Sequence, residues 1–212
     1  KLRAGKDTAA RYLTLFYDFQ PFAFADPLKR YLHEIFPHVP REPKPRRLLQ
    51  LFGQKMREID PDVWINLTMR QIDDYLRLHP CECGGSALKP RVVVTDCRQR
   101  NEYDRLRAEG FVFIRINADD ELRIQRALEA GDDFTVQDLA HETELLIDSF
   151  DVDYEIDNNG TTTELYEQID AIMHELGVTA CERSMTDKSD RLKARTVSGG
   201  TLAPTKKAIL NE

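Results

Sequence analysis

Short apolar runs alternate with longer stretches of helical periodicity through residues 1–177. Four runs rich in Val, Ile, Phe or Tyr are predicted to be strands, and each ends near an Asp or Asn: Phe19–Phe24, Arg91–Thr95, Phe111–Ile116 and Asp153–Ile156. An alternation of strands and helices is typical of a parallel sheet with helices on its faces. The pattern therefore predicts one α/β domain over residues 1–177.

Local signals predict where three of the helices begin. Asp26-Pro27 and Asp60-Pro61 each place an acidic N-cap before a proline at the first helical position. Thr161 and Glu164 form a capping-box pattern. Apolar residues recur at helical spacing in two stretches: Leu48, Leu49, Phe52 and Met56, and less regularly Ile65, Leu67, Ile72, Tyr75 and Leu76.

Residues 178–212 differ in composition from the rest of the chain. They are rich in Ser, Thr, Lys, Gly and Ala, so we expect a tail that is disordered or loosely attached. The net charge of the whole chain is −7; the tail holds seven basic and four acidic side chains, a net of +3, which leaves −10 on residues 1–177. A body that acidic is a poor general binder of nucleic-acid polymers. The negative net charge does not exclude small phosphorylated ligands, which need only a local basic pocket.

Composition narrows the class further. Hydrophobic residues make up 41% and charged residues 32% of the chain, as in a globular domain, and no apolar run approaches the roughly 20 residues that span a bilayer. The four cysteines show no framework spacing, which fits free thiols in a reducing cytoplasm. We therefore expect a cytoplasmic protein that binds no membrane.

The first eight residues contain the strongest candidate for phosphate chemistry. A phosphate loop has the pattern Gly, four residues, Gly-Lys, then Ser or Thr, and Gly5-Lys6 fits its second half. Asp7 occupies the usual hydroxyl position, and the hydroxyl follows at Thr8. The first glycine would sit one residue before Lys1, so we expect the native start and the strand before the loop to be missing. An ordinary polar helix start is the alternative interpretation.

A second candidate lies at the end of the predicted strand Arg91–Thr95. Asp96 follows this strand, where a P-loop kinase places a carboxylate near magnesium, directly or through water. A buried strand closed by an N-cap aspartate is the alternative. Ligands of open α/β sheets sit outside the carboxyl ends of the strands. Lys6, Asp26, Asp96 and Arg98 would converge at that edge.

Several short stretches match one family in order and spacing. They are Gly5–Thr8, Phe24–Lys29, Leu49–Gly53, Asp60–Trp64, Thr95–Arg98 with Asn101-Glu102, His141–Glu144, and Ile156–Thr161 with Glu164-Leu165. Together they resemble the deoxynucleoside monophosphate kinases, adenylate kinase-like P-loop enzymes frequent in bacteriophages. The resemblance implies a three-layer sandwich of a parallel sheet between helices, with its first strand missing here. It also implies transfer of the ATP γ-phosphoryl group to a deoxynucleoside monophosphate.

The resemblance also assigns the cofactor-binding residues. Mg²⁺ would bridge the ATP phosphates, with Asp96 and Thr8 as its protein ligands. Lys6 would hold the outer phosphates, and Thr8 the phosphate next to the nucleoside. The loop that surrounds the phosphates would be Arg3, Ala4, Gly5, Lys6, Asp7 and Thr8.

The acceptor nucleotide is assigned to a second group of residues. Asp26 and Arg98 would line the acceptor site, and Arg98 would also act in catalysis. Arg57 is the candidate for the acceptor phosphate, because a bidentate guanidinium suits that task. Trp64 either touches the acceptor base or lies in the core.

Residues late in the chain would complete the site. Arg123 and Arg126, at i and i+3 on one helical face, would enter a mobile lid and clamp the transferring phosphoryl group. A salt-bridged surface helix is the alternative. Asn158 and Gly160 would frame the ATP base through backbone contacts, unless Gly160 is only a turn glycine before a capped helix.

Other functions remain open. Another small-molecule P-loop kinase, with phosphomevalonate or dephospho-coenzyme A as acceptor, would share the loop, and so would a non-catalytic nucleotide-binding protein. The stretch His79–Gly85 contains Cys81 and Cys83, but a structural zinc site needs a second ligand pair, so we expect a connecting loop. Small nucleotides are the expected partners, and a homodimer is left open.

Overall fold

Five parallel strands form the centre of the structure, a computed structural model that describes residues 3–79, 90–130, 148–181 and 207–211. The strand order is β1-β2-β5-β3-β4, and every neighbouring pair is parallel. The strands are β1 (Phe19–Phe22), β2 (Arg91–Val94), β3 (Val112–Asn117), β4 (Tyr154–Asp157) and β5 (Lys207–Asn211). The predicted α/β class, with a parallel sheet between helices, is confirmed, and four of the strands match the predicted runs.

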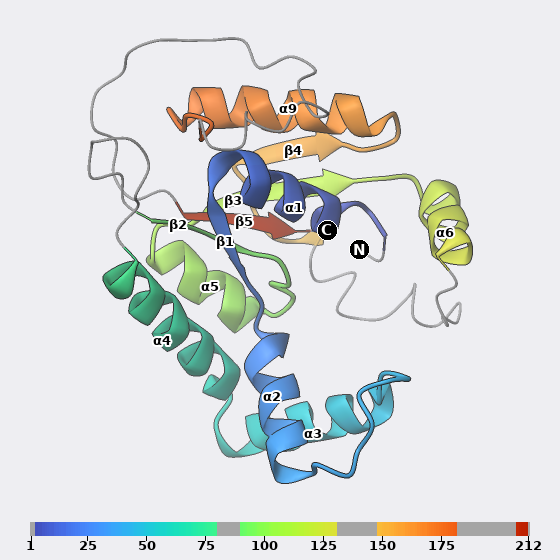
Figure 1. Ribbon diagram of the computed structural model, residues 1–212, viewed down its shortest axis with the longest axis vertical. Coiled ribbons are helices and arrows are strands. Elements are labelled where there is room, and N and C mark those ends of the chain that lie inside the picture. The colour runs from blue at the N-terminus through green and yellow to red at the C-terminus, as the bar shows by residue number, and fades with distance from the viewer. Residues whose placement is uncertain (1–2, 80–89, 131–147, 182–206, 212) are drawn as a thin grey trace.

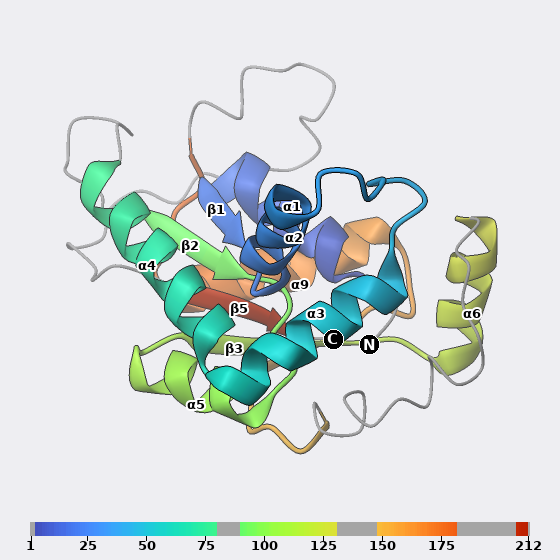
Figure 2. The same cartoon turned by 90° about the horizontal axis from the view of Figure 1, so that it is seen from below.

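Helices cover both faces of this sheet (Figures 1 and 2). One face carries α1 (Lys6–Tyr17) and α9 (Thr162–Glu175), and the other carries α4 (Val63–Leu78) and α5 (Arg100–Ala108). Two further helices, α2 (Ala25–Ile35) and α3 (Arg46–Ile59), pack against each other and against α4 beyond the end of β1. The last, α6 (Asp120–Glu129), stands to one side after β3.

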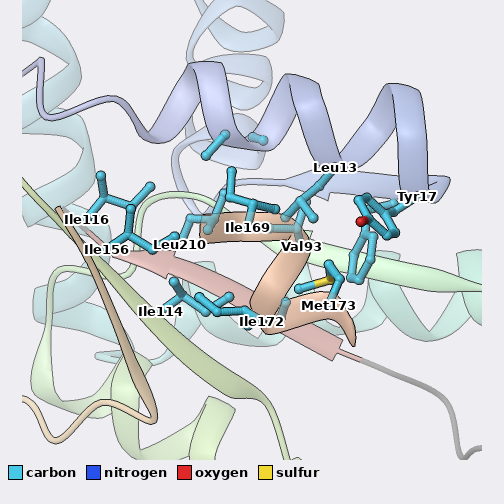
Figure 3. Packing of buried hydrophobic residues seen from close by; sticks show 14 of the residues in the cluster. Leu13, Tyr17, Val93, Ile114, Ile116, Ile156, Ile169, Ile172, Met173 and Leu210 are labelled. Atoms are coloured by element: carbon cyan, nitrogen blue, oxygen red, sulfur yellow. The ribbon is translucent and has the colours of Figure 1, made fainter. Parts of the chain in front are cut away.

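Each layer has its own apolar core. Under α1 and α9, Leu13 and Ile169 pack with side chains from all five strands, and Figure 3 shows this core from close by. On the opposite face, residues of α4 and α5 pack against β2, β3 and β5. A third cluster joins α2, α3 and α4 around Trp64. The third cluster gives the α2–α3 pair its own packing, beside the carboxyl edge of the sheet.

The centre of the sheet differs from the prediction. Instead of lacking its central strand, the sheet has β5 in that place, paired with β2 on one side and β3 on the other. The prediction that residues 178–212 form a tail is wrong for both described parts of that range. Val178 is buried against the α1–α9 core, and the Cys181 amide donates to the carbonyl of Phe16 at 2.7 Å.

Two of the three predicted helix starts are also displaced. Helix α2 begins at Ala25, so Asp26 lies in its first turn and is not the N-cap. Helix α4 begins at Val63, and the side chain of Asp60 accepts a hydrogen bond from the Asp62 amide instead of capping the helix. The capping box of Thr161 and Glu164 is confirmed at the start of α9.

A helix that crosses a bilayer needs roughly 20 predominantly apolar residues. Within the described residues, no helix is long and apolar enough to do so.

Candidate functional site

The segment before α1 has the backbone of an anion-binding loop. Arg3 has a φ of 59° and Gly5 a φ of 116°, so left-handed residues alternate with ordinary ones just before the helix. Such alternation turns successive amide N–H groups toward one point, where they form a concave anion site. Gly5 is the N-cap of α1 and contributes no side-chain cap, and a helix N-terminus attracts negative charge. The loop can therefore hold a phosphate group.

Gly5 is required at its position for two reasons. A φ of 116° is rarely adopted by residues with a side chain. A Cβ on Gly5 would also overlap the Nδ2 atom of Asn158 and lie 3.9 Å from Cγ2 of Ile116. Asn158 is buried, and its Nδ2 donates to the carbonyl of Ala4 at 2.7 Å. This hydrogen bond fastens the loop to the end of β4.

The arginines of α6 reach the same region. Arg126 donates through Nη2 to the carbonyl of Asn158 at 2.9 Å, and its Nη1 is buried without a hydrogen-bond partner among the described residues. Arg123 is buried and pairs with Asp120 one turn earlier. The structure therefore brings Arg126 to the residue that fastens the loop. The first turn of α6 also borders a shallow, open depression of about 630 Å³ lined by residues 117–121.

Lys6 is the first residue of α1 and is mostly covered. Its side chain is 17% exposed, and its Nζ lies 3.4 Å from a carboxylate oxygen of Asp7. Burial lowers the pKa of Lys6; Asp7 and Asp96 oppose this shift, and the positive charge of Arg98 adds to it. A mostly covered ammonium group favours an anionic ligand, because a ligand charge would offset the cost of its burial.

Asp96 holds the start of α2. Its two carboxylate oxygens accept hydrogen bonds from the amides of Phe24 at 2.7 Å and Ala25 at 2.9 Å. Burial raises the pKa of Asp96, while these two hydrogen bonds and Arg98 lower it. The alternative interpretation predicted that Asp96 is an N-cap, but the helix that follows, α5, has Gln99 as its N-cap, and Asp96 instead accepts from the first amides of α2. Each of its oxygens keeps a second lone pair, so the capping bonds leave it able to accept from a water molecule.

Positive charges from four segments interact at this edge of the sheet: the start of α1, helix α2, the segment around Lys44 and the residues after β2. Lys44, just before α3, has a pKa that is lowered by its partial burial and then by Lys29, Arg46, Arg98 and Lys6. Of these cations, Lys29 pairs with Asp26 at 2.9 Å. Like charges held close together repel, and the repulsion is relieved when a multiply charged anion binds among them. Together with the loop, this cation cluster forms the candidate site.

Glu102 positions the segment that carries Arg98. Its Oε2 accepts from the amides of Arg98 at 2.7 Å and Gln99 at 2.9 Å, and its Oε1 lies 3.8 Å from Nη2 of Arg57. Burial raises the pKa of Glu102 to about 7, the charge of Asp96 adds to the shift, and the two amides and Arg57 oppose it. Arg57, predicted to bind the acceptor phosphate, therefore contacts Glu102 at the rim of the site.

The raised pKa of Glu102 predicts a pH dependence. Folded protein keeps this proton above pH 4.5, where the unfolded chain releases it, so stability is lost as the pH rises toward 7. From pH 5 to 8, the unfolding free energy of the wild type should fall by about 2–3 kcal/mol relative to that of Glu102→Gln. Urea unfolding of both proteins across this range measures the difference. If the difference in unfolding free energy between the two proteins did not change with pH, the pKa of Glu102 would not be raised in the folded protein.

The remaining predicted residues divide into two groups. Five of them are exposed at the carboxyl edge of the sheet, beside the loop or the cation cluster: Arg3, Asp7, Thr8, Asp26 and Arg98. Trp64 is 2% exposed and its Nε1 donates to the carbonyl of Gly53 at 3.3 Å. Trp64 is thus a core residue, and its predicted contact with an acceptor base is wrong. Gly160 is exposed at the turn before the capping box, as its alternative interpretation predicted.

Some predictions lie outside the described residues. These are the connecting loop around Cys81 and Cys83, the motif His141–Glu144, the tail residues 182–206, and the loop positions Lys1 and Leu2.

Sequence reasoning missed Lys44, Arg46 and Glu102 as members of the site. Glu102 carried a detectable signal, because Gln99 and Glu102 form a capping box at the start of α5. Lys44 and Arg46 follow a proline-rich stretch without periodicity, and only the packing of α2 against α3 brings them to the loop.

Comparison with known proteins adds no assignment. No family model matches this chain, and no curated protein matches it. Function is therefore inferred from the residues of the site and their geometry.

Proposed function

We propose that the protein is a kinase that transfers the γ-phosphoryl group of ATP to a deoxynucleoside monophosphate. An oxygen of the acceptor phosphate attacks the γ-phosphorus, the bond to the bridging oxygen breaks, and ADP leaves as the deoxynucleoside diphosphate forms. The observation that carries the proposal is the left-handed loop at Arg3–Gly5, which leads into Lys6 beside Asp96 and a cation cluster. The deoxynucleotide as acceptor follows from the family resemblance.

The ATP phosphates are assigned to the loop and its neighbours. The loop amides and the start of α1 would bind the phosphates, and Lys6 would neutralise the outer ones. Arg126 supports this assignment, because its Nη1 is buried and lacks a hydrogen-bond partner among the described residues. Phosphoryl transfer depends mainly on such positioning and on neutralisation of the transferring charge. Arg123, held by Asp120, would orient this end of α6.

The acceptor is assigned to the other side of Lys6. Lys44, Arg46 and Arg98 would face its phosphate, between α3 and the end of β2. The α2–α3 pair lies beyond the carboxyl end of β1 (Figure 1), and a nucleoside bound at this edge of the sheet would lie beside it. Arg57 would approach from α3, and its contact with Glu102 would fix its direction.

A magnesium ion fits the residues at this site through water. Asp96 and Thr8 offer oxygen ligands, and Mg²⁺ usually keeps several waters and binds phosphates with one or two carboxylates. Both oxygens of Asp96 already accept amide hydrogen bonds, so its role would be to orient magnesium-bound water. When bound, the ion would neutralise charge on the transferring phosphates.

An acceptor panel tests the proposal. ADP release from ATP would be measured with each deoxynucleoside monophosphate, and with phosphomevalonate and dephospho-coenzyme A as competing acceptors. A glycine placed directly before Lys1 completes the loop pattern for this assay. We expect turnover with at least one deoxynucleotide. Turnover only with another acceptor, or ATP binding without transfer to any acceptor, would replace the proposal.

Lys44 provides a test of the acceptor side. Lys44→Ala should raise the KM for the acceptor by about 10- to 100-fold, the scale of one charged hydrogen bond to phosphate, with a smaller effect on the KM for ATP. Steady-state kinetics with each substrate varied in turn measures the split. Lys55→Ala is the control, because Lys55 is exposed on α3 and pairs with Glu58. Equal acceptor KM values for Lys44→Ala and Lys55→Ala would remove Lys44 from the site.

A further inference from the structure

The strand β5 is buried on both of its faces. Ala208 and Leu210 pack into the core under α1 and α9, whereas Ile209 packs into the core under α4 and α5. All three side chains are at most 2% exposed. A parallel strand that is apolar on both faces belongs in the interior of a sheet. This segment is therefore an integral central strand, although about 25 residues outside the described ranges precede it.

The register brings the end of β5 to the phosphate loop. Val94 pairs with Ile209, so the chain leaves β5 at the same edge at which Asp96 follows β2. Arg115 pairs with Asn211, and the next residue of β3, Ile116, is the one that a Cβ on Gly5 would approach to 3.9 Å. The loop therefore lies just beyond the carboxyl end of β5.

Helix α1 completes the arrangement. Its Ala9, Ala10 and Leu13 share one apolar cluster with Ala208 and Leu210 of β5, and Figure 3 shows Leu210 beneath this helix. A strand, a phosphate loop and a helix that packs back on the strand make up the P-loop unit. In a continuous unit the strand comes immediately before the loop in sequence. Here the strand is at residues 207–211 and the loop at residues 3–5.

We infer that β5 is the strand of the phosphate loop, so that one strand–loop–helix unit is assembled from two segments at opposite ends of the sequence. It follows that residues 185–212 can be moved in front of residue 1 without loss of the fold. The prediction about the sheet is independent of the activity, and only the nucleotide that the unit binds rests on the proposed function.

The experiment is a reordered chain. It begins at Met185, runs to Glu212, continues through one added glycine to Lys1, and ends at Ser184. Every original residue is kept, and the added glycine stands where the loop pattern requires its first one. A second version has three glycines at the junction, so that strain in a short connection is not mistaken for a wrong topology.

Thermal unfolding of the original and reordered chains is the primary readout, and ATP titration is the secondary one. At least one reordered chain should unfold cooperatively with a Tm no lower than that of the original. A junction of one or three glycines closes a smaller loop before α1 than the 25 residues that precede β5 in the original order, and a smaller loop costs less entropy. It should also bind ATP at least as tightly. Ile209→Asp should abolish cooperative unfolding in both orders, whereas Lys55→Ala should leave it unchanged.

Two results would overturn the inference: loss of cooperative unfolding in both reordered chains, or an unchanged Tm for Ile209→Asp in the original chain. If the reordered chains fold as expected and neither order transfers a phosphoryl group, the assignment of β5 stands and the proposed function fails.

Discussion

Replacing Lys6 with alanine is expected to lower the rate of phosphoryl transfer by at least about 10³-fold, the scale on which one well-placed stabilising group acts. Lys6 is the only lysine at the start of α1, it is mostly covered, and it lies in the field of both Asp96 and Arg98. Stability should not fall, because burial lowers the pKa of Lys6 and its ammonium group is held in the fold at a cost. Single-turnover kinetics and urea unfolding together measure this split.

The matched control is Arg11→Ala, which removes an exposed cation from the same helix. It should change neither turnover nor stability. If Lys6→Ala retained turnover within about tenfold of the wild type, Lys6 would not be the residue that neutralises the outer phosphates.

Replacing Gly5 with alanine is the second large effect. Gly5 has a φ of 116°, and its new Cβ would collide with the Asn158 amide that donates to Ala4. The strain and the lost hydrogen bond should together cost about 2–4 kcal/mol of stability. The loop would also move from its anion-binding shape, so the affinity for ATP should fall by about 10²-fold or more. Urea unfolding and ATP titration measure both effects.

Gly177→Ala separates the two causes. Gly177 has a φ of 65° and nothing within 4 Å of the position of its Cβ, so this variant adds only backbone strain. It should lose less stability than Gly5→Ala and keep its affinity for ATP. Equal losses of stability in the two variants, with ATP affinity unchanged in both, would show that contact with Asn158 does not shape the loop.

The four predicted strands could be recognised because each is a local signal. Val92–Val94 is an apolar run buried in the sheet, and Phe113, Ile114 and Ile116 are buried apolar residues of β3, so composition alone indicates both strands. The capping box at Thr161 is equally local, since all of its atoms lie within one turn. Asp26 resembles an N-cap in sequence but lies in the first turn of α2, whose first amides bond to Asp96, distant in sequence. Asp60 instead accepts from the Asp62 amide.

β5 could not be recognised in the same way. Lys207–Asn211 has only three apolar residues in a row, and it follows a stretch rich in Ser, Thr and Gly. Its stability as a strand comes from β2 and β3, which lie about 100 residues earlier in the chain. Non-local pairing of this kind leaves little trace in a short window of sequence.

The candidate site was predicted in part. Gly5, Lys6 and Asp96 were found because phosphate loops and strand ends have recognisable sequences. Lys44 was not, because its role depends on how the α2–α3 pair packs beside the sheet. Trp64 was assigned to two environments by its chemistry, and only the packing of α2, α3 and α4 around it decides between them.

Transfer of labelled phosphate tests the proposed activity most directly. The chain with a glycine before Lys1 is incubated with Mg²⁺, ATP labelled at the γ-phosphate, and each deoxynucleoside monophosphate in turn, and the products are separated by chromatography. The proposed function predicts label in the deoxynucleoside diphosphate for at least one acceptor, and loss of that product in Lys6→Ala. Label found only in inorganic phosphate, or retained in ATP with every acceptor, would contradict it.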